Sequence, residues 1–438
     1  MSGPSQNLTV FWLRHDLRLE DNAGLSRALE SGDPVLPVFI FDTRILDSLS
    51  NKADARVHFI HQTLHSLEKR LNQHNSSLLV YHGTPLESWK NLVERFSIKR
   101  VYANADYDPY AIKRDEQIKD FLKQRDIDFT LVKDSVIFEK NEILKADGDP
   151  YIVYTPYKNR WLDNLNDLVL QEHPSTSLFG QFVKTPPFGL LELKEIGFRE
   201  TQMSFDEPEL DTDIIKNYHK TRDYPWLKDG TTRLGMHLRF GTISIRKCVQ
   251  AGLRLNSTWL SELVWREFFK SILYHFPHVE QRAFRKAYEE IEWRNDREEF
   301  NRWCEGTTGY PIVDAGMRQL NQSRFMHNRV RMITASFLCK HLLIDWRWGE
   351  RYFAEKLFDY DLSANNGNWQ WAAGTGCDAA PYFRIFNPAI QAQKYDPKSK
   401  YIKEWVPEWN TSDYPGPLVE HKYARERALR TYKSSIKK

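Results

Sequence analysis

The sequence has few cysteines, no long apolar run and no region resembling a signal peptide. Its four cysteines lie far apart and form no Cys-x-x-Cys pair, which argues against a disulfide framework or a thiolate zinc site. No apolar stretch approaches the roughly 20 residues that a membrane-spanning helix needs. Residues Met1 to Leu8 lack the basic and apolar regions of a secretory signal. We therefore expect a cytoplasmic protein that makes no membrane contact.

Charge is also nearly balanced, with a net value of +3 over 438 residues. Residues up to Ser135 carry a net charge of −1 and the remainder +4, so bulk charge alone does not indicate a nucleic-acid-binding protein. Tryptophan is distributed unevenly, because 12 of the 14 lie beyond residue 160. Together with a length that exceeds one ordinary hydrophobic core, this predicts two domains of different character.

Apolar runs alternate with helical patterns in the first part of the chain, residues 6–135. This alternation predicts a doubly wound parallel α/β sheet with right-handed crossovers. The continuous apolar character of these runs predicts strands that are buried on both faces. The expected strands are Thr9–Leu13, Val35–Phe41, Leu78–His82, Arg100–Ala103 and Phe129–Val132.

Periodicity weakens over residues 136–206, where several prolines interrupt the chain, so we expect a connector with short helices. From residue 207 to 438 the amphipathic stretches show helical spacing without strand patterns, which predicts an all-helical second domain. Its clearest helices are Trp259–Phe276, Tyr310–Gln319, Phe325–Leu342 and Trp348–Leu357.

The segment Asp359–Trp371 combines acids, amides and two tryptophans around a glycine, and we expect a Gly-interrupted turn there. Polar groups at this density need partners when they are buried. Asp359 and Asp361 could simply cap a helix while the indoles fill the core. That explanation is adequate for any one residue and poor for the whole cluster, which indicates a functional site.

Two expected helices each carry a group of candidate functional side chains on one face. Trp259, Glu262, Trp265 and Arg266 recur at intervals of three or four, which is typical of a binding face, or of an ion pair between Glu262 and Arg266.

On the second helix, Asn328, Arg331 and Met332 share a face and Arg329 lies at its edge. A buried Arg331 would require an acid such as Asp359. The alternative is a surface arginine in a solvated stripe.

Two other patterns are less specific. Gly230–Gly235 is a turn rich in hydroxyls and backbone donors, suited either to phosphate groups or to an ordinary helix cap. His58, His61 and His65 share a helical face at metal-ligand spacing, but no nearby acid or cysteine completes a site. We therefore expect a solvated helix face and no metal.

Six longer motifs are distributed along the chain. With the stretches above they closely resemble the photolyase and cryptochrome family, specifically the class I enzymes that repair cyclobutane pyrimidine dimers. The resemblance covers nearly the whole chain. Its motifs are Trp12–Asn22, Tyr154–Trp161, Trp265–Phe268, Gly309–Asp314, Met326–Arg329 and Phe383–Pro388.

The resemblance implies FAD held in a U shape in the helical domain. Arg331 would pair with Asp359 near the isoalloxazine, and Asn365 would lie beside flavin N5, where a carboxylate would disfavour the anionic reduced flavin. The implied cofactor-binding residues are Tyr218, Thr231, Thr232, Arg233, Leu234, Gly235, Trp259, Glu262, Arg266, Asn328, Arg331, Asp359, Asp361 and Asn365.

The implied activity is that of a carbon–carbon lyase: excited reduced flavin donates an electron to the dimer, the cyclobutane ring opens, and the electron returns. The dimer would be flipped out of the duplex into a pocket. Glu262 and Asn365 would take part in catalysis, and three tryptophans, Trp369, Trp346 and Trp293, would carry electrons to oxidised flavin. The implied substrate-binding residues are Glu262, Trp265, Asn328, Arg329, Met332 and Trp371.

Some positions depart from the family pattern. Phe325, Gly235 and Tyr360 replace a Trp, a Ser and a Gly, which affects fine flavin packing. The loop Asn104–Ala111 lacks the Asn-Glu pair of folate-binding members. A second antenna chromophore, either 8-hydroxydeazaflavin or methenyltetrahydrofolate, therefore stays open.

The resemblance also defines the partners and the rival functions. We expect a monomer that binds DNA containing pyrimidine dimers, in association with the nucleoid if the source is bacterial. One rival is a cryptochrome-type blue-light receptor without repair activity, which would often carry an acid or Cys in place of Asn365. The other is repair of the pyrimidine-pyrimidone photoproduct, whose enzymes use two histidines where Asn328 and Met332 stand.

Overall fold

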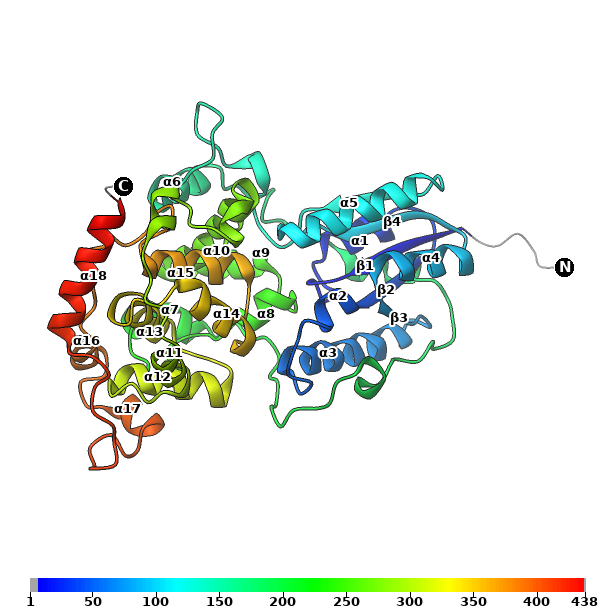
Figure 1. The fold of residues 1–438 in the computed structure, drawn as a ribbon. Coiled ribbons are helices and arrows are strands. Elements are labelled where there is room, and N and C mark those ends of the chain that lie inside the picture. The colour runs from blue at the N-terminus through cyan, green and yellow to red at the C-terminus, as the bar shows by residue number, and fades with distance from the viewer. Residues whose placement is uncertain (1–6, 437–438) are drawn as a thin grey trace. The chain divides into compact units, whose positions relative to one another are not determined.

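The protein forms two compact units in the computed structural model, which describes residues 7–436 (Figure 1). Chain segments from the expected connector enter both units, because Lys140–Asn164 falls in the second unit and Leu165–Glu209 in the first. The first unit consists of residues up to Glu139, Leu165–Glu209 and Leu234–Gln250; the second consists of Lys140–Asn164, Leu210–Arg233 and Ala251–Lys438.

The first unit contains a five-stranded parallel sheet in the order β3-β2-β1-β4-β5, which confirms the predicted α/β fold. Every residue of the central strand β1 is buried. The edge strands β3 and β5 are partly exposed, so the expectation that all five are buried on both faces was wrong for these two. The strands are β1 (Leu8–Leu13), β2 (Val35–Asp42), β3 (Leu79–Gly83), β4 (Ile98–Asn104) and β5 (Asp128–Val132).

Helices complete this unit, and side-chain caps begin several of them: Asn22 caps α1, Asp54 caps α3 and Thr84 caps α4. The helix α9 (Ile245–Leu255) contributes residues to both units. The other helices are α1 (Ala23–Leu29), α2 (Thr43–Leu46), α3 (Ala55–Asn72), α4 (Pro85–Arg95), α5 (Pro109–Lys123), η2 (Ser175–Gln181), η3 (Leu193–Ile196) and α8 (Gly235–Phe240).

The histidines of α3 do not form a solvated face, contrary to expectation. His58 and His61 are buried, and only His65 is exposed. The ring of His58 hydrogen-bonds Thr201 at 3.1 Å, and that of His61 hydrogen-bonds the carbonyl of Leu191 at 2.9 Å. Chain beyond residue 190 covers this side of the helix, and local periodicity could not reveal such a distant segment.

A buried network of charges ties the first unit together. Arg18 donates to both oxygens of Asp134 at 2.6 and 2.8 Å, and Arg246 donates to Asp134 at 2.8 Å and to Asp21 at 2.9 Å. Burial alone would raise the pKa of Asp134, but the two guanidinium groups outweigh it and hold the pKa at about 2. The network joins residues more than 200 positions apart.

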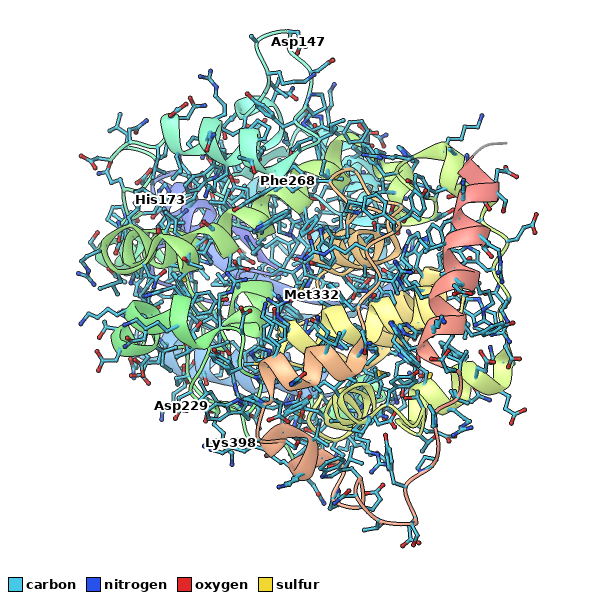
Figure 2. The ribbon with its side chains drawn as sticks, turned by 90° about the vertical axis from the view of Figure 1, so that its left-hand side faces the viewer. Asp147, His173, Asp229, Phe268, Met332 and Lys398 are labelled. Carbon is cyan, nitrogen blue, oxygen red and sulfur yellow. The ribbon has the colours of Figure 1, made fainter. Side chains whose placement is uncertain are left out.

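The second unit is helical, as predicted, and Figure 2 marks Phe268 on α10 and Met332 on α13. No helix of the described residues is long and apolar enough to cross a membrane. Its elements are η1 (Lys140–Glu142), α6 (Tyr154–Asp163), α7 (Thr212–Thr221), α10 (Ser257–His275), η4 (Pro277–Glu280), η5 (Lys286–Glu290), α11 (Arg297–Glu305), α12 (Pro311–Ser323), α13 (Asn328–Ser336), the π-helical turn η6 (Phe337–His341), α14 (Trp346–Lys356), α15 (Leu362–Ala373), α16 (Pro388–Tyr395), α17 (Lys400–Trp405) and α18 (His421–Ile436).

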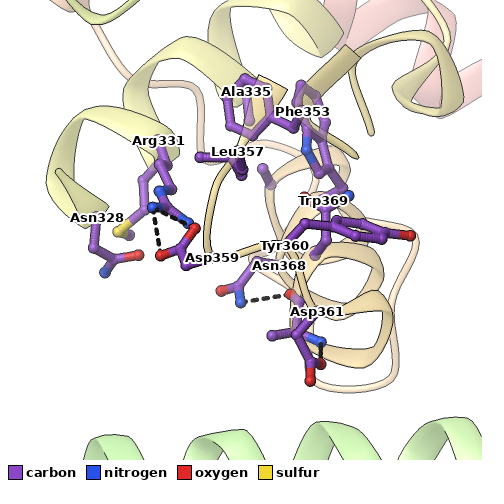
Figure 3. Close-up of a pocket in the computed structure, with 14 residues that line it drawn as sticks. Asn328, Arg331, Ala335, Phe353, Leu357, Asp359, Tyr360, Asp361, Asn368 and Trp369 are labelled. Atoms are coloured by element: carbon purple, nitrogen blue, oxygen red, sulfur yellow. Dashed lines mark hydrogen bonds and ion pairs between the residues drawn. The ribbon is translucent and has the colours of Figure 1, made fainter. Parts of the chain in front are cut away.

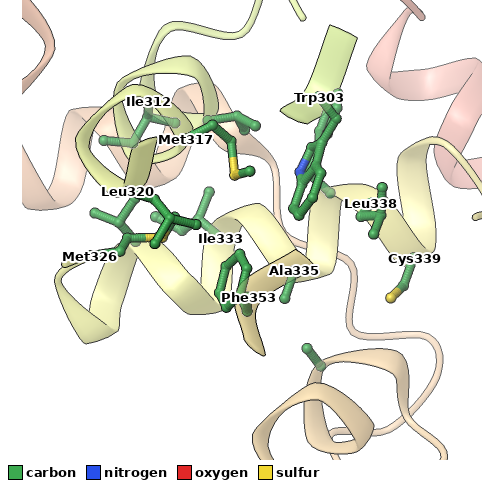
Figure 4. Packing of buried hydrophobic residues seen from close by; sticks show 14 of the residues in the cluster. Trp303, Ile312, Met317, Leu320, Met326, Ile333, Ala335, Leu338, Cys339 and Phe353 are labelled. Atoms are coloured by element: carbon green, nitrogen blue, oxygen red, sulfur yellow. The ribbon is translucent and has the colours of Figure 1, made fainter. Parts of the chain in front are cut away.

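The core of the second unit is built around aromatic and aliphatic side chains of α11 to α15 (Figure 4). Trp303 lies at its centre, with ring centroids 6.0 Å from Phe353 and 6.1 Å from Trp369. The indole of Trp303 also donates to the carbonyl of Thr334 at 3.2 Å. This rigid core holds α13, α14 and α15 against one another.

Two local expectations for this unit were wrong. The expected helix from Phe325 begins at Asn328, because the ring of His327 accepts from the backbone of Arg329 and so caps it. Asp359–Trp371 contains no Gly-interrupted turn, since α15 runs through Gly367. A Cβ at Gly367 would lie 2.1 Å from the ring of Phe269, so glycine there allows α10 and α15 to approach closely.

Candidate active site

A cavity opens in the second unit between α13, α14 and α15 (Figure 3). Seven of the predicted site residues line it, and they come from two segments of the chain. They are Asn328, Arg331, Met332, Asp359, Asp361, Asn365 and Trp369.

The predicted ion pair between Arg331 and Asp359 is present on this lining. Arg331 donates through Nη2 to the carboxylate oxygens at 2.9 and 3.1 Å, and through Nε to the carbonyl of Met326 at 2.7 Å (Figure 3). Both side chains keep about a fifth to a quarter of their surface exposed. Since the pair is only partly buried, its charges remain accessible from the cavity.

The carboxylate of Asp361 both caps a helix and forms an ion pair. It caps α15 by accepting from the backbone of Ala364 at 3.0 Å and from the hydroxyl of Ser363 at 2.5 Å. It also pairs with the buried Lys270 of α10 at 3.0 Å. The cap and the ion pair fix the first turn of α15, which carries the next cavity residues.

Asn365 lies one turn further along α15, and its amide nitrogen donates to Glu350 of α14. The acceptors are the backbone carbonyl at 3.0 Å and the carboxyl Oε1 at 3.1 Å. Burial raises the pKa of Glu350 to about 7, although the hydrogen bond from Asn365 opposes the shift. With both donated bonds made to Glu350, the side chain of Asn365 is held in one orientation.

A second polar cluster surrounds Glu262 on α10. Arg222 donates to its carboxylate at 2.5 Å and lies over the ring of Tyr218, 5.2 Å from the centroid. Burial raises the pKa of Glu262, and the charge of Arg222 opposes that shift. Glu262 therefore pairs with a residue from the segment after α7. Sequence spacing had left open a binding face or an ion pair with Arg266, and the observed partner is Arg222.

The turn that resembles a phosphate-binding segment lies beside Trp259, whose indole donates to the hydroxyl of Thr232 at 3.4 Å. Arg233 adopts a left-handed backbone with φ 51°, and its guanidinium lies 5.1 Å from the ring centroid of Phe325. Thr231 is half-buried. Leu234 and Gly235 belong to the first unit.

The other predicted substrate residues do not line the cavity. Trp265 stacks on Tyr154 with ring centroids 3.5 Å apart. Arg329 donates to Asp223 at 2.6 Å and lies over a tyrosine ring of α16. Trp371, near the end of α15, packs against the core. Arg266, which was predicted to bind the cofactor, is half-buried on α10.

The three tryptophans of the expected electron chain differ in burial. Trp369 and Trp346 are buried in the same core cluster, with 2% and 1% of their surfaces exposed. Trp293 packs at its margin, and its ring centroid lies 5.9 Å from that of Tyr432. Trp369 and Trp346 are thus enclosed in the core, and Trp293 is partly exposed.

Comparison with known proteins identifies the family. The family model for the FAD binding domain of DNA photolyase matches residues 259–413, and the model for DNA photolyase matches residues 9–177. A deoxyribodipyrimidine photo-lyase from Vibrio cholerae is 36% identical over 478 residues, covering 98% of this chain and 100% of the relative. The chain belongs to the DNA photolyase family.

Solved photolyase structures share the fold over the whole chain. A bacterial class III photolyase from Agrobacterium tumefaciens matches with a TM-score of 0.87 and 33% identity, covering 100% of this chain and 99% of that one. An archaeal photolyase from Sulfolobus tokodaii, solved with two FAD molecules, matches with a TM-score of 0.82 and 34% identity, covering 98% and 100%. The cavity described above lies within the FAD-binding domain of this photolyase family member.

Sequence reasoning missed the partners that hold the predicted residues in place. Three such partners were not singled out from spacing or composition: Lys270, which pairs with Asp361; Glu350, which accepts from Asn365; and Arg222, which pairs with Glu262. Lys270 offered one signal, because a lysine on the apolar part of a buried helix needs an acid. Glu350 and Arg222 had none, since their partners lie 15 and 40 residues away.

Proposed function

We propose that the chain is a light-dependent DNA repair enzyme, a class I cyclobutane pyrimidine dimer photolyase. The observation that carries the proposal is the cavity, where seven residues that the family resemblance implied meet within the FAD-binding domain. The class I assignment rests on the motifs of the sequence. The Agrobacterium class III enzyme has the same fold.

The cavity residues fit FAD in chemistry. Arg331 offers a cation and Asn328 an amide with no hydrogen bond to another described residue, while Trp369 supplies an apolar wall. Reduced FAD, when bound and excited by blue light, would supply the electron that opens the cyclobutane ring. The protein's part is to bind and orient the cofactor and to keep water from the reacting groups.

Asn365 would present a neutral amide at the flavin edge. A carboxylate there would repel an anionic flavin, whereas an amide can hydrogen-bond it without adding charge. The two hydrogen bonds to Glu350 fix which way the amide points. Asn365 thus acts directly on the cofactor, and Glu350 acts on Asn365.

Glu262 would bind the flipped dimer by hydrogen bonds to the base edge, with Trp265, Met332 and Trp371 as apolar walls. Extrusion of a damaged pair costs only a few kcal/mol, because the lesion already weakens its stacking and pairing. One oxygen of the Glu262 carboxylate accepts a hydrogen bond from Arg222, which would hold Glu262 in place for its contact with the base edge.

Repair of dimers under blue light tests the proposal. Purified, photoreduced protein is mixed with thymine oligomers that contain cyclobutane dimers, and the recovery of thymine absorbance is followed during illumination. We expect recovery in the light and none in the dark. Absence of recovery in protein with bound reduced FAD would contradict repair and favour a cryptochrome-type photoreceptor.

A further inference from the structure

Tyr154, the first residue of α6, lies flat against Trp265 of α10. The ring centroids are 3.5 Å apart and the planes 6° from parallel, and only 7% of the tyrosine surface is exposed. Facing rings at this separation are in van der Waals contact over most of their area. One face of the Trp265 indole is therefore covered by a partner from a distant segment.

Tyr154 is itself anchored at two points. Its hydroxyl donates to the carbonyl of Ser261 at 2.7 Å, and its backbone N–H donates to Asp378 at 3.0 Å. In α-helical geometry the Ser261 carbonyl also accepts from the backbone of Trp265, four residues later. The tyrosine is thus tied to the same turn of α10 whose indole it covers.

The stack continues beyond Trp265. Phe269 lies 5.4 Å from Trp265, with its plane inclined by 30°, and Gly367 of α15 makes room for the Phe269 ring. The aromatic column Tyr154–Trp265–Phe269 therefore links α6, α10 and α15. Rotation of Trp265 about its side-chain bonds would break its contacts with both rings.

Tyr154 has no proton chemistry of its own in this position. Burial raises its pKa, and the nearby charge of Glu262 raises it further, while the Ser261 hydrogen bond opposes the shift. The phenol therefore stays neutral through the physiological range. Its influence on Trp265 is geometric.

We propose that Tyr154 is a positioning residue for Trp265, fixing the plane of the indole that borders the flipped dimer. The inference rests on the proposed function, because it requires Trp265 to contact the lesion. A fixed indole loses no rotational freedom when the dimer enters, so its contact with the dimer carries no further entropic cost. Loss of Tyr154 should weaken binding of the dimer and leave binding of undamaged DNA unchanged.

Substitution of Tyr154 by Leu and by Phe separates the aromatic plane from the hydroxyl. Tyr154→Leu should weaken binding of a single-dimer oligonucleotide about two- to tenfold, the range expected for one aromatic pair. Tyr154→Phe keeps the ring and should stay within about twofold of the original protein. The control is Tyr157→Leu, on the same helix and also buried; Tyr157 contacts Phe268 but, unlike Tyr154, does not stack on Trp265, so this variant should leave dimer binding unchanged.

Dissociation constants for dimer-containing and undamaged oligonucleotides, the FAD content and the number of dimers repaired per absorbed photon are measured for each holoenzyme. Equal loss of affinity for both oligonucleotides, or loss in the Tyr157 control, would overturn the inference. If Tyr154→Leu does not retain FAD, Tyr154→Met replaces it, and failure of both assigns Tyr154 to folding and rejects the inference. Failure of the original protein to repair dimers would instead reject the proposed function.

Discussion

The two units place their charged side chains in different surroundings. In the first unit, Arg18, Arg246 and Asp134 are buried to more than nine-tenths and satisfy one another. In the second, Arg331 and Asp359 also pair, but about a fifth to a quarter of each side chain is exposed and both line a cavity. The same kind of ion pair thus occurs once within a closed network and once on a cavity wall.

This difference distinguishes structural charges from those available to a ligand. A closed, buried network has used its hydrogen-bonding capacity within the protein, so its removal leaves uncompensated charge in the interior. A pair on a cavity wall keeps contact with the open space, so its removal leaves groups that water can reach. The first should affect folding, and the second should affect what the cavity binds.

The largest effect is expected from Asp134→Asn in the first unit. It leaves Arg18 and Arg246 without a carboxylate that both contact, which typically costs about 3–5 kcal/mol of stability. Chemical unfolding measures this loss. The carboxylate's stabilisation is present above its ordinary pKa of 3.8 and is lost as the pH falls towards about 2. The difference in unfolding free energy between the original protein and the Asp134→Asn variant should therefore become smaller in acid.

An exposed aspartate provides the control for this substitution. Asp149→Asn breaks the surface pair with Lys145, whose two atoms are 3.4 Å apart, and should leave the unfolding midpoint unchanged. An equal loss in both variants would mean that the buried network contributes no more than a surface pair. The contrast between the units would then have no energetic basis.

Asp359→Asn should give a smaller change in stability and a clear loss of FAD. Charge-assisted hydrogen bonds contribute about 1.5–3 kcal/mol, so FAD affinity should fall by roughly ten- to a hundredfold. The ratio of flavin to protein absorbance after dialysis measures retention, and unfolding measures stability. Stable FAD binding combined with a large loss of stability would place this pair with the structural network of the first unit.

Glu289→Gln is the matched control for the cavity pair. It removes one of the two carboxylate partners of Arg347. This pair is similarly exposed and lies in the second unit, with the two atoms 2.7 Å apart. Neither Glu289 nor Arg347 lines the cavity. The variant should keep its FAD, because the broken pair has no access to the bound ligand.

Much of the fold could be predicted because its signals are local. The five strands begin and end within two residues of the predicted positions, since buried apolar runs in an α/β unit are interrupted by polar turns. The exposure of β3 and β5 could not be predicted in this way. It depends on the strand order, which is set by pairing between segments far apart in the chain.

The site was predicted through residue clusters and family resemblance, and its supporting contacts were not. Asp359, Asp361 and Asn365 are close in sequence, so their proximity was visible. Gly367 was interpreted as part of a turn. In the structure it makes room for the ring of Phe269, which lies about a hundred residues earlier in the chain, so the local sequence could not reveal this contact. The partners of a site residue depend on tertiary packing and have no local pattern.

The smallest effect concerns a buried cation of the second unit, Lys340. Its ammonium donates to the carbonyl of Ala373 at 2.7 Å and lies 3.6 Å from the ring centroid of Tyr432. Among the described residues no carboxylate pairs with it, and the neutral thiol of Cys339 is the titratable group beside it in the chain. Burial therefore lowers the pKa of Lys340 to about 7. Arg246 in the first unit, facing two carboxylates, shifts in the opposite direction.

Lys340→Met tests whether this cation titrates within the folded protein. The native state favours the neutral amine, so its stability is greatest above the ordinary pKa of 10.5 and falls as the pH decreases towards about 7. The variant lacks this loss, and its melting temperature relative to the original protein should rise by roughly 2 °C or more between pH 9 and pH 6. Lys356→Met, which removes a partly exposed lysine over the ring of Tyr352, is the control. A difference that does not change with pH would show that Lys340 keeps its charge when buried, and that a carbonyl and an aromatic face can replace the carboxylates that Arg246 requires.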